Sequence, residues 1–304
     1  MTCGWLCISD TLNVLFSVVT VPVYFFVLLV IYQYKATTFD SSFFVFFAST
    51  GVADIWFLVH KTVFRAIPSL FFSQWAQQQD WMATVLRMGL WGIYFAEVHG
   101  VLLMTINRFT ALIWPTRYET LWSVSLVRGS LAAQWVVAMA WALPMILPPF
   151  QSHFRNAMLD VVMNDSAAEL LWYRAAAILE PFIIAPSLFT MYLVMFLVVY
   201  HGHRSQPLTI ALRSSQTQQT NRKAELNLAL MGFVLSALYI FLCFTYILLA
   251  LEVEQELTSY VYNYVSTLFV ASNPFMLMVF SKSLRKKIRQ TLKIKNEAKP
   301  RRNN

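Results

Sequence analysis

Two carboxylic acids stand inside long apolar stretches of the sequence. Asp54 lies in GVADIWF and Glu97 lies in IYFAEVHG. A charge at bilayer depth costs about 2.5–3.5 kcal/mol on insertion scales, so each such residue is a functional hypothesis. Together with Asn273, which precedes Pro274 in another apolar stretch, the acids could form a polar layer that binds a cation or a water cluster. Alternatively, each carboxyl is hydrogen-bonded or protonated between helices.

Other chemistry finds no support in the residue pattern. The sequence contains no nucleophile elbow, HExxH motif or Gly-rich phosphate loop. Its histidines and three cysteines do not gather with metal-ligand spacing, and they give no disulfide framework. We therefore expect no enzyme activity, no metal, no cofactor and no nucleic-acid partner.

Long apolar windows must position these polar residues. Of the 304 residues, 58% are hydrophobic and 12% are charged, about half the charged fraction of a typical soluble domain. A helix needs about 20 mostly apolar residues to cross a bilayer. The windows predict an all-α bundle of seven transmembrane helices. The expected spans are 12–34, 42–65, 84–108, 129–150, 174–200, 225–251 and 258–281.

Basic residues are distributed unevenly between the two sides of this bundle. With the N-terminus outside and the C-terminus inside, 18 of the 23 Lys and Arg residues lie on the cytoplasmic side, in agreement with the positive-inside rule. Lys61 and Arg65, at the outer end of the second span, are expected to extend to the membrane boundary. Asn164 begins an N-x-S/T sequon in a loop on the outer side, so it is a predicted glycosylation site.

The C-terminal segment has its own pattern. Leu284, Ile288 and Leu292 repeat every four residues among lysines and arginines. This spacing predicts a short amphipathic helix after the seventh span, lying on an anionic inner leaflet of the lipid bilayer.

An arginine with a distinctive setting follows the third apolar window, in TINRFTALIWP. Arg108 has Asn107 and Phe109 as neighbours, and Pro115 follows. This arrangement resembles the third-helix ending of rhodopsin-like G-protein-coupled receptors. Two further stretches, GVADI and SNPFMLMVF, resemble the second-helix and seventh-helix motifs of the same receptors. The stretch MTINRFTALIWPTRYETLW is similar to the nematode serpentine chemoreceptors of class gamma and the related classes V and U. The seven-span pattern extends this resemblance over residues 12–290.

The resemblance implies a multi-pass receptor of the plasma membrane, including sensory cilia, that detects a small molecule outside and activates a heterotrimeric G protein. Residues 1–290 would form the receptor domain, and residues 282–304 its basic cytoplasmic tail. The residues assigned to G-protein coupling are Arg108, Asn107, Phe109 and Pro115. Arg108 would lie near the inner end of the third helix. The residues assigned to an intramembrane polar switch are Asp54, Asn273 and Pro274.

Several positions depart from the rhodopsin-like pattern. Asn107 replaces the acid that holds the arginine at rest in those receptors, and Leu277 stands where the Asn-Pro motif would have a tyrosine. The sixth span has no proline, and no cysteine is available to tie the third helix to the second outer loop. A resting contact of Arg108 must therefore be weaker or use another partner.

A ligand of such a receptor would bind in the outer half of the bundle. The candidate lining residues are Trp91, Tyr94, Glu97, Tyr246 and Asn263. Because we find no acid in the outer third to anchor an amine, this aromatic and weakly polar lining suits a small volatile or lipid-like molecule. The alternative for each residue is ordinary helix packing.

A ligand-gated channel or a transporter is the main alternative function. Insect-type olfactory channels have seven helices in the opposite orientation, which the distribution of basic residues disfavours. Transporters commonly have internal repeats and broken helices, whereas this sequence has only 8 glycines and no repeat.

Overall fold

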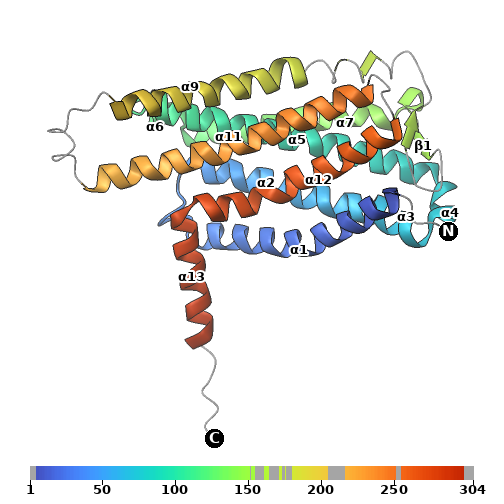
Figure 1. The fold of residues 1–304 in the computed structure, drawn as a ribbon, viewed down its shortest axis with the longest axis horizontal. Coiled ribbons are helices and arrows are strands. Elements are labelled where there is room, and N and C mark those ends of the chain that lie inside the picture. Colours follow the sequence, from blue (N-terminus) through green and yellow to red (C-terminus); the bar gives the residue numbers. More distant parts are fainter. Residues whose placement is uncertain are drawn as a thin grey trace, which may run out of the picture.

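The computed structural model describes residues 5–150, 152–154, 161–163, 171–172, 175, 180–204, 216–250 and 255–297. Long helices run side by side along one axis, and a shorter C-terminal helix lies across one end of them (Figure 1). The long helices are α1 (Trp5–Gln33), α2 (Ser42–Lys61), α5 (Asp80–Ile113), α7 (Val124–Ala142), α9 (Ala185–Arg204), α11 (Gln216–Ala250) and α12 (Gln255–Phe280).

Short elements connect and extend these helices. The short helices are α3 (Ile67–Phe71), α4 (Ser73–Gln77), α6 (Tyr118–Leu121) and the C-terminal α13 (Lys282–Glu297). Strands β1 (Ser152–Phe154) and β2 (Val161–Met163) pair antiparallel. Single turns of other helix types are the π-helical Thr62–Ala66 and Glu180–Ile184 and the 3-10 segments Leu143–Ile146 and Pro148–Phe150.

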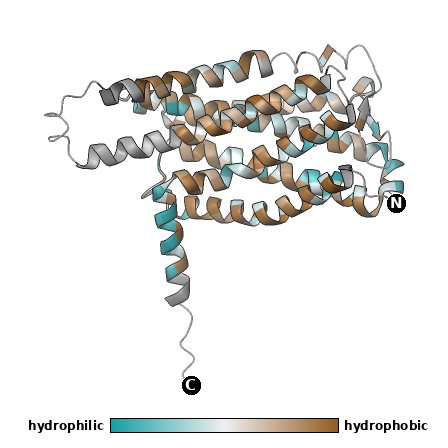
Figure 2. Cartoon of the chain, in the orientation of Figure 1, coloured by the Kyte–Doolittle hydropathy of each residue, from teal (hydrophilic) through white to brown (hydrophobic). Residues whose placement is uncertain are grey.

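The predicted all-α membrane bundle is confirmed. Six helices of the described residues are long and apolar enough to cross a membrane, and a seventh apolar stretch, Phe182–Val198, is shorter. Figure 2 shows hydrophobic residues along the lengths of the helices and hydrophilic ones concentrated near the ends and on α13. Some boundaries differ from the predicted spans. The third helix continues to Ile113, so Arg108 lies within it, and α11 begins at Gln216, before the predicted start of the sixth span.

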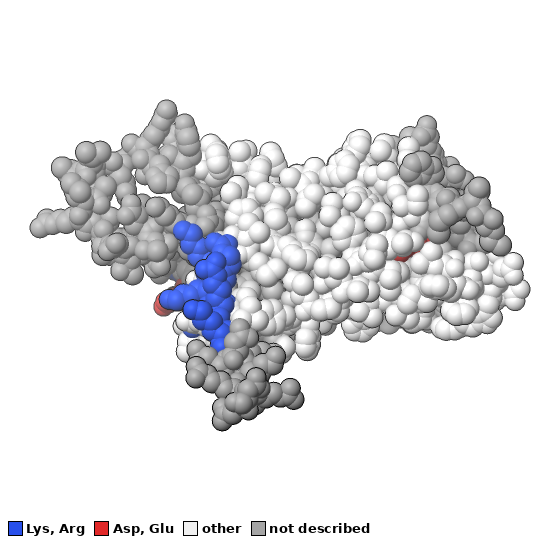
Figure 3. Space-filling view, turned by 60° about the horizontal axis from the view of Figure 1, so that its bottom comes forward, with Lys and Arg blue, Asp and Glu red and all other residues white. Residues whose placement is uncertain are grey.

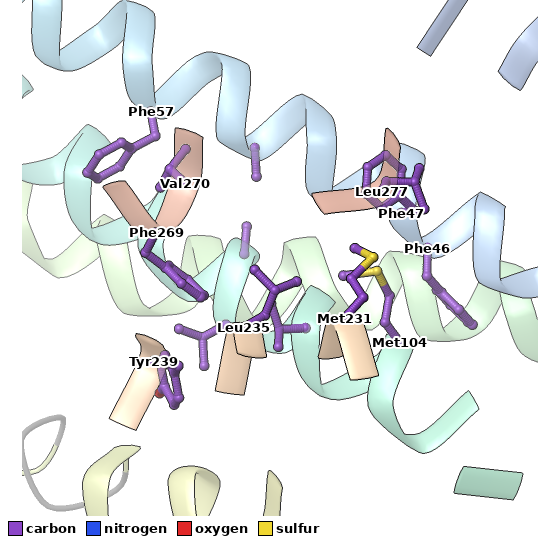
Figure 4. Packing of buried hydrophobic residues seen from close by; sticks show 14 of the residues in the cluster. Phe46, Phe47, Phe57, Met104, Met231, Leu235, Tyr239, Phe269, Val270 and Leu277 are labelled. Carbon is purple, nitrogen blue, oxygen red and sulfur yellow. The ribbon is translucent and has the colours of Figure 1, made fainter. Parts of the chain in front are cut away.

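The interior of the bundle is filled by aromatic and aliphatic side chains from α2, α5, α11 and α12 (Figure 4). Phe47 and Phe57 of α2 and Phe269 of α12 are among its buried members. Leu277, at the position where the rhodopsin-like motif has a tyrosine, is completely buried in the same cluster. An apolar side chain therefore takes the place of that hydroxyl.

Two glycines let α5 approach α2 closely. A Cβ atom at Gly89 would overlap the His60 ring, and one at Gly100 would overlap the Thr50 hydroxyl. The His60 ring nitrogen Nε2 lies 3.2 Å from the backbone oxygens of Val85 and Leu86. Small residues at helix contacts in membranes allow backbones to approach and hydrogen bonds to form across the interface. These contacts fix the second and third transmembrane helices against each other.

The β-hairpin covers one end of α5. Arg87 Nη1 donates to Ser152 Oγ at 3.0 Å. Phe154 is buried in a small apolar cluster with Met82, Ala83 and Leu86, among others. These contacts join the second outer loop to the third helix, where the sequence offers no cysteine for a disulfide.

Candidate functional site

A layer of four buried polar residues crosses the middle of the bundle, and we call it the middle layer: Tyr24, Asp54, Glu97 and Asn273. Asn273 Nδ2 donates to Asp54 Oδ2 at 2.8 Å, and the Tyr24 hydroxyl donates to the same oxygen. Glu97, which is 1% exposed, belongs to the same layer and interacts with Asp54. The structure thus brings together the three residues that the sequence suggested and adds a tyrosine from α1.

The middle layer has a distinct chemistry. Asp54 receives two donors on one oxygen, and Glu97 is a second buried acid in the same layer. Buried carboxyl groups beside amide and hydroxyl groups are the residue types that can bind a cation or a water cluster. Pro274, the next residue of α12, is buried and lies within the continuous helix.

Lys61 occupies a position that differs from the prediction. It was expected to extend to the membrane boundary, but its side chain is 2% exposed. Its ammonium group donates to the Asn263 carbonyl oxygen at 2.9 Å, to Thr267 Oγ1 at 2.9 Å and to Ser266 Oγ at 3.4 Å. All three acceptors are neutral and come from α12. Because these three residues present acceptors on one face of α12, the ammonium is solvated by protein instead of by water.

Arg65 is also buried, again contrary to the prediction. Its Nε atom lies 3.6 Å from Asp10 Oδ1, and its Nη1 donates to Asn263 Oδ1 at 3.2 Å. Asp10 lies in α1 with 1% of its surface exposed. The expectation that the outer third contains no acid is therefore wrong, because the first helix begins earlier than predicted and carries Asp10 into the bundle.

We call this set the outer network: Asp10, Asn13, Lys61, Arg65, Asn263, Ser266 and Thr267. Asn13 joins it by accepting a hydrogen bond from the Thr267 hydroxyl at 2.5 Å. Sequence reasoning missed the network although a signal was present. Asp10, Asn13, Ser17 and Thr20 recur every three or four residues in the first span, and all are buried. That spacing marks one polar face of a helix, which must turn away from lipid.

The five candidate ligand-lining residues do not share one network. Glu97 belongs to the middle layer and Asn263 to the outer network. Trp91 packs beside Phe95, with ring centroids 5.8 Å apart. Tyr94 also packs on Phe95 at 5.9 Å, and Tyr246 packs on Tyr262 at 5.8 Å. For the three aromatic candidates, the structure therefore shows the helix-packing contacts that were the alternative.

At the other end of the bundle, Arg108 lies against an aromatic ring. Its guanidinium carbon is 3.8 Å from the centre of the Phe43 ring, and the residue is 7% exposed. One helical turn away, Thr105 Oγ1 lies 3.1 Å from the hydroxyl of Tyr192 in α9. A Cβ at Gly232 of α11 would overlap that same hydroxyl. The contacts near Arg108 thus join the third helix to the second and the fifth, and the fifth helix to the sixth.

Asn107 has a role different from that of the acid it replaces. Its Nδ2 donates to Ser42 Oγ at 2.7 Å, and its Oδ1 accepts from the Tyr118 hydroxyl at 3.2 Å. The Ser42 and Tyr118 hydroxyls are themselves 2.9 Å apart. Asn107 therefore ties α6, in the second inner loop, to the start of α2. We call Ser42, Asn107 and Tyr118 the inner network.

The remaining predicted residues lie around this end or outside the described chain. Phe109 is half-buried and meets Trp114 edge to face, with centroids 6.0 Å apart. Pro115 is exposed in the turn between α5 and α6. Trp122 donates its indole N–H to Thr110 Oγ1 at 2.7 Å, which further secures α6. The predicted glycosylation site, Asn164, lies outside the described residues.

The chain resembles known proteins over most of its length. Residues 13–294 match the family described as Serpentine type 7TM GPCR chemoreceptor Srv. The chain belongs to this family. It is also similar to Serpentine receptor class V-1 of Caenorhabditis elegans, with 22% identity over 297 residues that cover 94% of this chain and 92% of the relative. The resemblance to nematode serpentine chemoreceptors is confirmed. Membership in Srv favours class V among the sister classes, and it points to a membrane receptor rather than an enzyme.

Proposed function

We propose that this Srv family member is a chemosensory receptor of the plasma membrane and of sensory cilia. It detects a small molecule from outside and activates a heterotrimeric G protein inside. The observation that best supports this function is the setting of Arg108. The arginine is buried near the predicted cytoplasmic end of α5, where its guanidinium group lies on the Phe43 ring of α2.

The signal would pass along α2 and α12. The outer network and the middle layer both join these two helices, through Lys61 to Asn263 and through Asp54 to Asn273. A ligand that moves the outer part of α12 relative to α2 therefore acts on both sets of hydrogen bonds. The ligand shifts the population between two arrangements by its different affinity for each. Pro274 weakens the helix immediately inside the middle layer, because proline removes a backbone donor.

The inner ends would then separate and admit a helix of the G protein. In the described arrangement, the Tyr192 hydroxyl fills the space beside Gly232, so α9 and α11 are packed closely at this level. Outward movement of α11 would uncover Thr105 and Arg108. The guanidinium would leave the Phe43 ring and extend into the opening, with Asn107, Phe109 and Pro115 positioned around it.

Membrane topology tests this proposal most directly. We would tag the N-terminus, stain cells without permeabilising them, and compare the gel mobility of the wild type with that of Asn164→Gln. We expect the tag to be accessible and the variant to lose a glycan shift. If the N-terminus is cytoplasmic, the basic loops face away from any G protein and the proposal fails. Ion conductance would then be the property to record, because a channel becomes the leading alternative.

A coupling measurement follows once the topology is known. Purified receptor in lipid nanodiscs would be mixed with G protein, and basal guanine-nucleotide exchange would be measured. Arg108→Ala should reduce the exchange rate, whereas Arg117→Ala, an exposed arginine on the same predicted side, should not. Equal effects of both substitutions would show that Arg108 acts only as a general positive charge.

A further inference from the structure

Helix α13 carries a strongly basic face that the receptor mechanism does not use. Lys282, Lys286, Arg289 and Lys293 recur every three or four residues and are all exposed. Figure 3 shows these basic side chains gathered at one end of the bundle, while the flank of the bundle in the same view is nearly free of charged side chains. A hollow of about 450 Å³ lies along this face. Its lining consists of Lys282, Arg285, Lys286, Arg289, Gln290 and Lys293.

The position of α13 relative to the bundle is fixed by several contacts. Leu284 is completely buried in the core. The Ser281 hydroxyl accepts the backbone N–H of Leu284 at 3.2 Å and so caps the start of the helix. On another side of α13, Lys287 Nζ lies 4.3 Å from the centre of the Tyr34 ring at the end of α1. The basic face is therefore held in one orientation instead of rotating freely.

Arg285 contributes to the hollow from a fixed position. Its Nη1 donates to the Met278 carbonyl oxygen at 2.8 Å and also to that of Val279, at the end of α12. A side chain that is already ordered loses less conformational entropy when a ligand binds. The hollow is thus partly preorganised.

The charge of this face points to a ligand that carries several negative charges. Like charges three or four residues apart on a helix repel one another, and the four exposed cations form such a series. A lipid headgroup with one net charge neutralises one of them. A single polyphosphorylated headgroup neutralises several at once and immobilises only one molecule. Basic clusters next to the inner end of a transmembrane helix are a known mode of recognising such lipids.

We propose that this hollow is a binding site for the headgroup of a polyphosphorylated inositol lipid in the inner leaflet. The inference goes beyond general attraction to an anionic surface, because it assigns the selectivity to one face of α13. The proposed orientation of the chain in the membrane decides only which leaflet supplies the lipid. The site itself would bind the headgroup whether or not the receptor couples to a G protein.

Native mass spectrometry of the full chain, purified in detergent, would test the site. The probes are phosphatidylinositol bisphosphate and phosphatidylserine, supplied separately at matched total charge. Wild-type receptor should retain the phosphoinositide at least about tenfold more tightly. The variant Lys286→Gln/Arg289→Gln should weaken retention by about 25-fold, since each basic residue near a membrane surface contributes about fivefold.

The matched control removes the same charge elsewhere. Lys35→Gln/Arg117→Gln takes away two positive charges of exposed residues on the same predicted side, outside the hollow, and should change retention by less than about threefold. Equal retention of both lipids by the wild type, or equal loss in both variants, would overturn the proposal in favour of diffuse attraction. If the double variant elutes abnormally on size exclusion, the single substitutions Lys286→Gln and Arg289→Gln replace it. Neither ligand nor G protein is present, so failure here leaves the receptor function untouched, and failure of coupling leaves the lipid site untouched.

Discussion

The outer and inner halves of the bundle bury basic side chains by different means. In the outer network, the Lys61 ammonium is surrounded by three oxygen atoms of α12, and Arg65 pairs with Asp10. At the inner end, the Arg108 guanidinium lies on the Phe43 ring, and Asn107 binds hydroxyl groups of the neighbouring loop instead. Charge-assisted hydrogen bonds to buried acceptors are strong and directional, whereas a cation over a ring keeps more freedom.

This difference indicates that the two halves of the bundle have different roles. A set of three donors matched to three acceptors has one good arrangement, so the outer network holds α1, α2 and α12 together. Single hydroxyl contacts contribute about 0.5–1.5 kcal/mol each, which is small enough for a partner protein to exchange. We infer that the outer half provides stability and the inner half provides the movable contacts. The following predictions test that division.

The largest effect is expected for Lys61→Met. The substitution removes the ammonium and leaves its α12 acceptors without their donor, so the free energy of unfolding should fall by about 3 kcal/mol. Thermal unfolding in detergent would measure the loss. Lys35→Met, at an exposed lysine near the end of α1, is the matched control and should have no effect. If Lys61→Met unfolds at the wild-type temperature, the outer network does not hold the helices together.

A smaller loss is expected for Gly89→Ala. The new methyl group would displace the His60 ring and break its contact with the α5 backbone, at a cost of about 2 kcal/mol. Gly129→Ala introduces the same methyl group on α7, where no atom lies within 4 Å of the added Cβ. This control should unfold like the wild type or slightly later. Similar behaviour of the two variants would contradict the close contact of α2 with α5.

Tyr118→Phe should have a local effect. Loss of its hydroxyl weakens the inner network by about 1 kcal/mol and should loosen α6 without unfolding the bundle. Hydrogen exchange would report faster exchange at Tyr118–Leu121 and unchanged protection in α2 and α12. Tyr32→Phe, at a tyrosine that is 79% exposed, provides the control. A uniform loss of protection along the bundle would mean that the inner network is as structural as the outer one.

The smallest change is expected for Phe43→Leu. The substitution keeps an apolar side chain but removes the ring beneath Arg108, a contact worth about 0.5–1 kcal/mol. Without this contact, Arg108 should raise basal nucleotide exchange by about two- to fivefold. Phe71→Leu, at the exposed end of α3, should leave the exchange rate unchanged. A decrease instead of an increase would show that Phe43 supports the active arrangement.

Some features of the site were predictable from the sequence and others were not. Asp54, Glu97 and Asn273 were recognised because a polar residue in an apolar window is conspicuous. Tyr24 was not, since a tyrosine in such a window gives no signal of its own. Lys61 and Arg65 were misplaced because long basic side chains near helix ends usually reach water. Their burial depends on the acceptors that α12 presents to them.

The sequence by itself determined the helical class, the approximate position of each helix and the amphipathic character of α13. The physical reason is that a membrane imposes length and hydropathy on every span locally, since each backbone must satisfy its own hydrogen bonds. Only the tertiary structure decided which polar groups meet. Contacts between polar groups depend on the rotation and depth of each helix relative to its neighbours. Glycines such as Gly89 and Gly100 help to set these by permitting close contact between helices. Asp10 and Arg65, or Asn107 and Tyr118, acquire their partners only through that packing.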